Sequence, residues 1–164
     1  MSEQLSAQES QGFEYVDLKE VDPNFQAVPD GFYNLKVIKA FIKEFTYGPT
    51  AKKAGQTGQI AKFQFAVIDE GSPARGRRLF DGFFADARGL ADMRRIMDAS
   101  GVLQDDGESL AMWLEKLVAQ GAEVKTRVAV VPAVDFKTRQ PRVDPLSGKP
   151  IMDNKIYWKE AQPA

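Results

Sequence analysis

The regular patterning of the chain begins near residue 31, where apolar and polar positions start to alternate with a period of two. Tyr33, Leu35 and Val37 fall on one face of an extended segment. At Ile38 the alternation changes phase, because the small aliphatic face continues from the even position Ala40. One extra residue in a strand produces such a shift, so we expect a bulge here that bends the strand sharply.

Four more strands and two helices are expected further along the chain. Alternating apolar positions predict strands at 59–69, 77–84, 122–132 and 154–160. A helical apolar stripe between a capping residue and a glycine predicts helices at 86–101 and 109–121. This order predicts a mainly β fold, a five-stranded OB-fold-like barrel with helices between strands 3 and 4. An open α+β sheet is the alternative, and the bulged first strand favours the barrel.

The chain divides into two unequal parts by composition. Residues 1–29 are rich in Ser, Gln and Glu and are expected to be an acidic, partly disordered N-terminal arm. Residues 30–160 are expected to form one domain. The acidic, polar start is not typical of a secretion signal, and no apolar run approaches the ~20 residues of a membrane span. We therefore expect a cytoplasmic protein with no membrane partner.

The sequence contains neither cysteine nor histidine. Disulfides and thiolate nucleophiles are thereby excluded, and the usual general base and commonest metal ligand are missing. We expect a protein that is not an enzyme and that needs no cofactor or metal.

The net charge of -1 conceals a segregation of charge along the chain. Residues 31–84 hold nine Lys or Arg against four acids, and residues 122–164 hold eight against five. Residues 85–121, between them, hold four against seven. Separated basic blocks are typical of proteins with a polyanionic partner, although strand-rich regions also tolerate exposed lysine.

The first strand places rings and cations together on the face opposite its aliphatic residues. Single-stranded nucleic acid exposes flat bases and a charged backbone, so a binder needs rings for stacking and cations for phosphates. The loops 48–58 and 133–150 are also basic, and the corresponding loops of an OB-fold flank its binding groove. The candidate nucleic-acid-binding residues are Lys39, Phe41, Lys43, Phe45, Tyr47, Lys52, Lys53, Lys62, Arg77, Arg139 and Arg142.

Other interpretations of these residues stay open. Phe41 and Phe45 could instead pack beneath the helices or in a dimer interface, and the same face could dock a polymerase, helicase or recombinase. Phe63, Phe65 and Phe80 are expected in the core. A metal-dependent nuclease is a weaker alternative, in which Glu123 and Lys125 would act with an upstream carboxylate, Asp69 or Asp81.

Several spaced blocks carry a resemblance to a known family. "DGFYNLKVIKA", "FQFAVID", "GRRLFDGFF", "RRIMDASG", "GAEVKTRVAV" and "NKIYW", which extend over most of residues 30–158, resemble the single-stranded-DNA-binding proteins of bacteriophage replication and recombination modules. The resemblance implies an OB-fold, binding with little sequence preference, and protection of single-stranded DNA. It also implies replication or recombination proteins as further partners, and the host-cell cytoplasm as location. Whether the chain forms an oligomer stays open.

The chain departs from one common feature of single-strand binders, an acidic C-terminal tail. Here the acidic segment is at the N-terminus. We hypothesise that residues 1–22 dock into the basic groove when DNA is absent, or recruit a replication partner.

Overall fold

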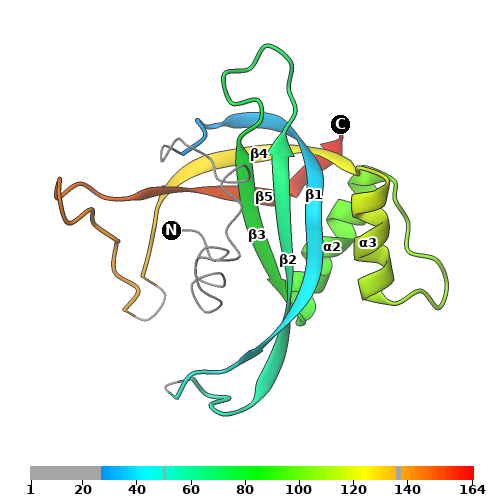
Figure 1. The fold of residues 1–164 in the computed structure, drawn as a ribbon, viewed down its shortest axis with the longest axis horizontal. Helices are drawn as coiled ribbons and strands as arrows, with labels where there is room; N and C mark the ends of the chain where they lie inside the picture. Colours follow the sequence, from blue (N-terminus) through cyan, green and yellow to red (C-terminus); the bar gives the residue numbers. More distant parts are fainter. Residues whose placement is uncertain (1–26, 50, 136–137) are drawn as a thin grey trace, which may run out of the picture.

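The computed structural model describes residues 27–49, 51–135 and 138–164. Within them the chain forms five strands and two helices, with both helices between β3 and β4 (Figure 1). The elements are β1 (Gly31–Thr46), β2 (Thr57–Val67), β3 (Arg78–Phe84), α2 (Ala87–Ser100), α3 (Leu110–Ala119), β4 (Glu123–Pro132) and β5 (Met152–Pro163). The mainly β class with a helical insertion is thus confirmed. The hypothesis about residues 1–22 concerns a segment outside the described residues.

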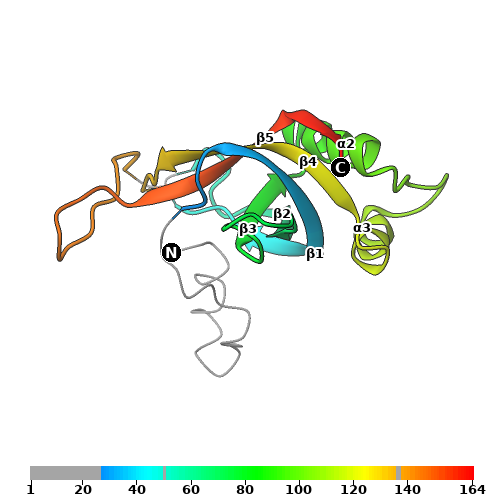
Figure 2. The same ribbon diagram turned by 90° about the horizontal axis from the view of Figure 1, so that it is seen from above.

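The five strands form one antiparallel sheet in the order β3-β2-β1-β4-β5. β1 pairs with β4 through Gly31–Lys36 and with β2 through Leu35–Thr46. Figures 1 and 2 show it curving from the β4–β5 part of the sheet to the β2–β3 part. Among the described residues no ladder joins β3 to β5. The sheet is therefore open, and the expectation of a closed barrel is wrong.

The expected bulge in β1 is confirmed at Ile38. Val37 pairs with Phe65 of β2, while Lys39 pairs with the adjacent residue Gln64, so that Ile38 is an extra residue. Because of this insertion, Ala40 faces the same side of the sheet as Val37, and Lys39 faces the opposite side.

The core lies between the inner face of the sheet and the two helices. Leu35, Val37, Phe63, Phe65, Val124 and Val128 are buried on the sheet, and Met93, Ile96, Trp113, Leu114 and Leu117 are buried on the helices. α2 packs against β5, β3 and β4, whereas α3 packs against β1. Val28 is only 1% exposed, so the folded body begins within the segment predicted to be an arm.

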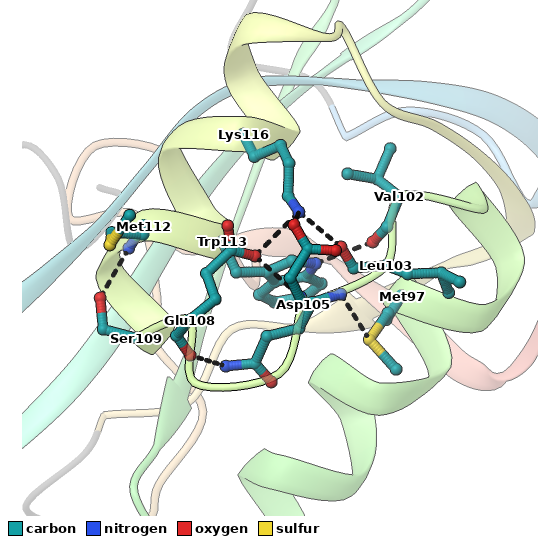
Figure 3. Close-up of polar contacts among 10 residues, drawn as sticks. Met97, Val102, Leu103, Asp105, Glu108, Ser109, Met112, Trp113 and Lys116 are labelled. Carbon is teal, nitrogen blue, oxygen red and sulfur yellow. Dashed lines mark hydrogen bonds and ion pairs between the residues drawn. The ribbon is translucent and has the colours of Figure 1, made fainter.

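Polar contacts fix the connection between α2 and α3, as Figure 3 shows. The Nζ atom of Lys116 donates to the carbonyl oxygen of Leu103 at 2.7 Å and pairs with Glu108 at 2.8 Å and Asp105 at 3.3 Å. The hydrogen bond to Glu108 is the main cause that raises the pKa of the Lys116 amino group. Trp113 donates from Nε1 to the carbonyl oxygen of Val102 at 2.8 Å, which secures α3 over the core.

Side chains join the two edges of the open sheet. Trp158 of β5 donates from Nε1 to a carboxylate oxygen of Asp81 on β3 at 2.7 Å. Its ring also lies 5.1 Å from that of Phe65 and 5.9 Å from that of Phe83 between ring centroids. This contact holds β3 and β5 together where no backbone hydrogen bonds do so.

Replacing Trp158 by Phe tests this link. The variant keeps an aromatic ring in the core but removes the indole donor from Asp81. We expect the free energy of unfolding to fall by ~1–3 kcal/mol, the cost of a lost hydrogen bond in a largely buried site. Urea unfolding of Trp158→Phe, Asp81→Asn and the double variant measures the coupling. Strictly additive losses would show that the two side chains do not stabilise each other.

Candidate nucleic-acid interface

The face of β1, β2 and β3 that points away from the core is here called the outer face. Residues directly opposite each other on neighbouring strands share a face, so the register defines which side chains it carries. Its cross-strand rows are Lys36–Ala66–Arg78, Lys39–Gln64–Phe80, Phe41–Lys62–Gly82, Lys43–Ile60–Phe84 and Phe45–Gly58. Cations and rings thus alternate along β1 from Lys39 to Phe45, and three of the rows combine a lysine with a ring.

Three rings of the outer face are accessible to solvent. Phe41 is 45% exposed, Phe84 39% and Phe80 36%. The alternative in which Phe41 packs beneath the helices is therefore wrong. Large rings exposed together on one face of a sheet are typical of a binding surface.

Phe45 and Tyr47 are half-buried, and they cover each other rather than the core. Phe45 meets Tyr47 at 4.9 Å and Phe84 at 5.6 Å between ring centroids, both edge to face. The Nζ atom of Lys53 lies 5.9 Å from the centre of the Tyr47 ring. The rings of Phe45, Tyr47 and Phe84 thus form one cluster at the end of the outer face, next to the β1–β2 loop.

Gly58 provides the space for this cluster. A Cβ atom at position 58 would lie 2.8 Å from Cζ of Phe45, closer than side-chain atoms normally approach. The absence of a side chain on β2 therefore allows the Phe45 ring to lie across the neighbouring strand.

A polar group lies at the floor of the outer face. Gln64, between Lys39 and Phe80, is 3% exposed, and its Oε1 atom meets no hydrogen-bond donor among the described residues. An unsatisfied buried acceptor costs ~1–3 kcal/mol, and this oxygen is too enclosed for a ligand to reach unless its neighbours move.

The predicted basic residues lie in several places around the outer face. Lys39, Lys43 and Lys62 are on it, and Lys52 and Lys53 are exposed in the β1–β2 loop. Arg139 and Arg142 lie in the long β4–β5 loop, which projects to the same side of the sheet as the β1–β2 loop in Figures 1 and 2. Arg77 lies in the turn before β3, at the end of the sheet away from the Phe45 cluster.

The β4–β5 loop is held in shape by its own hydrogen bonds. The backbone N–H groups of Ala133, Arg142 and Ile151 donate in a ring, to Ile151, Ala133 and Arg142 respectively. At the tip, the backbone N–H of Leu146 and the hydroxyl of Ser147 hold the pKa of Asp144 below its ordinary value. Arg142 is thus fixed at the base of this loop rather than on a loose chain.

The expectation that Phe80 belongs to the core is wrong. Leu79, Asp81 and Phe83 are the inner positions of β3, which places Phe80 and Phe84 on the outer face. The period-two alternation showed that Phe80 and Phe84 share a face of β3, but it did not show which face is buried. An acid is expected to face solvent, so Asp81 favours the opposite orientation of β3. Its inward position depends on the hydrogen bond from the indole of Trp158, which is distant in the sequence.

The two upstream carboxylates of the nuclease alternative already have hydrogen-bond partners. Asp81 points inward to Trp158, and Asp69 accepts hydrogen bonds from the backbone and side chain of Asn34. Glu123 and Lys125 occupy the face of β4 opposite the buried Val124. In the described part of the chain, no three Asp, Glu, His or Cys residues form a group that could hold a metal ion, and no helix there is long and apolar enough to cross a membrane.

Comparisons with protein-family models, with curated proteins and with solved structures found no match to this chain.

Replacing Gly58 by Ala should displace the Phe45 ring and with it the contact to Tyr47. Because the nearest atom is the far end of a side chain, the ring should move while the fold persists. Near-ultraviolet circular dichroism and the ring proton shifts of Phe45 and Tyr47 report the change. Gly48→Ala is the matched control, since nothing lies within 4 Å of a Cβ atom there. Equal spectra for the two variants would contradict this packing.

Proposed function

We propose that this chain binds and protects single-stranded DNA, without sequence preference, on its outer face. The observation that carries the proposal is a face of three strands on which three cross-strand rows each combine a lysine with an exposed ring, while the other side already forms the core. Unpaired bases would stack on the rings, and the lysines between them would contact the phosphates.

The rings of the outer face would have two different roles in binding. Phe41 and Phe80 have accessible surface and no ring contact among the described residues, so they would receive bases. The cluster of Phe45, Tyr47 and Phe84 would close the end of the path beside the β1–β2 loop. Stacking contributes ~1–3 kcal/mol per base, so two bases with several phosphate contacts give roughly micromolar affinity.

We propose further that this sheet is an OB-fold. The strand order, the double pairing of β1, and the position of the helices between β3 and β4 support an OB-fold whose β3–β5 seam is joined by side chains. The two loops that flank the groove of such a fold are here the basic β1–β2 and β4–β5 loops.

The biological setting follows from the resemblance to phage single-strand binders. We propose that the protein acts in a phage-type replication or recombination module, in the host-cell cytoplasm, and that other proteins of the module are partners. It acts by binding and not by catalysis, and it needs no cofactor.

Titration of the full chain with a labelled oligo-dT at two salt concentrations, beside a duplex of equal length, tests the proposal. We expect tighter binding to the single strand, with log K falling by ~0.7 per phosphate contact for each tenfold increase in salt. Affinity that does not change with salt would instead indicate a hydrophobic protein-docking face. Cleavage of the strand on addition of magnesium would indicate a nuclease.

Phe41→Ala and Phe80→Ala should each lower the affinity for oligo-dT by at least about fivefold, the smallest effect expected from the loss of one stacked base. Met112→Ala is the matched control, because this side chain is 56% exposed but lies on α3, away from the outer face. If all three variants bind equally well, bases do not stack on the outer face.

A further inference from the structure

A second group of rings and cations lies on β1, β4 and β5. Phe32 of β1 is opposite Arg127 of β4, and Arg127 is opposite Tyr157 of β5. The guanidinium carbon of Arg127 lies 3.9 Å from the centre of the Tyr157 ring, and the Nζ atom of Lys155 lies 5.2 Å from it. We call these four residues the second row.

Phe32 distinguishes the second row from an ordinary cross-strand pair. The Arg127–Tyr157 contact alone is a common means of stabilising a sheet. Phe32, however, is 47% exposed, the largest exposure of any phenylalanine among the described residues, and it forms no ring–ring or cation–π pair with them. Its exposure has no evident role in packing, but a ring of this kind can receive a base.

The second row is continuous with the outer face through β1. Phe32, Asn34 and Lys36 alternate with the buried Leu35 and therefore face away from the core. The bulge at Ile38 keeps the next polar residue, Lys39, on this same side. Figures 1 and 2 show that the curved β1 links the two parts of the sheet.

The charge along this connection suits a phosphate backbone. Five cations, Lys36, Lys125, Arg127, Lys155 and Lys159, lie along it. They outnumber by one the four acids that neighbour them, Glu123, Glu160, Asp69 and Asp30. Glu160 accepts a hydrogen bond from Nε of Arg127 at 2.7 Å, which raises the pKa of the guanidinium and fixes its plane over Tyr157. The amide oxygen of Asn34 is buried beside the row without a donor among the described residues.

We propose that the second row is a further base-binding subsite for the same single strand of DNA. The inference rests on the proposed function and extends it, since the strand would pass from the outer face along β1 to Phe32. If the extra residue Ile38 is left out, Phe32 lies about eight residues along β1 from Phe41, or about 26 Å at ~3.3 Å per residue. At ~3.4 Å per stacked nucleotide, about eight nucleotides separate the two subsites.

The test measures affinity against oligo-dT length, from about 4 to about 20 nucleotides, a range that brackets the site sizes of single-strand binders. The full chain is compared with Phe32→Ala, with Arg127→Lys, which keeps the charge but loses the planar guanidinium, and with Phe41→Ala. Met112→Ala is again the control for loss of an exposed apolar side chain, and thermal unfolding confirms that each variant is folded.

We expect Phe32→Ala to weaken binding of the longest oligomer by about fivefold to a hundredfold, with a smaller loss for Arg127→Lys, and to leave the shortest unchanged. Phe41→Ala should weaken both. If the Phe32 and Arg127 variants match the wild type at every length while Phe41→Ala weakens binding, the second row is not a subsite and the proposed function stands. If Phe41→Ala also has no effect, the proposed function itself fails.

Discussion

The structure depends on one constraint: the ammonium groups of Lys39 and Lys43 cannot be buried in the core beside Leu35 and Val37. An uninterrupted alternation along β1 would direct these lysines into the core, where an unpaired ammonium group is far too costly. The extra residue Ile38 changes the phase, so that Ala40 and Ile42 continue the core face. The same slip turns Phe41 outward, which leaves rings among cations on an exposed surface. One bulge thus determines both the core and the candidate site.

The bend in β1 also explains how one sheet can present two regions for binding. Gly31–Lys36 pair with β4, before the bulge, and Leu35–Thr46 pair with β2, mostly after it. Rings and cations lie on the outward side of both parts, and only the core side is covered by the helices. The open seam between β3 and β5 depends on Trp158 and Asp81, so the integrity of the outer face depends on a contact made on the opposite side of β3.

Local features could be predicted from the sequence because their causes are local. The side chains of Asp86 and Ser109 cap α2 and α3 as expected, and Gly101 ends α2 in the left-handed conformation. The bulge followed from the change of phase in β1. The orientation of β3 could not be predicted, because it depends on a donor 77 residues away. The open seam was missed for a related reason, since period-two patterns predict strands but not which edges pair. The second row was missed because Phe32, Arg127 and Tyr157 belong to three separate segments that only the register brings together.

The central claim is that unpaired bases lie on the outer face of the bulged strand. Photo-crosslinking tests it most directly: an oligonucleotide with a photoreactive uracil is bound to the full chain, irradiated, and its attachment sites are mapped by mass spectrometry. The account predicts crosslinks to Phe41 and Phe80. Crosslinks confined to α2 and α3, with none on β1 or β3, would contradict it.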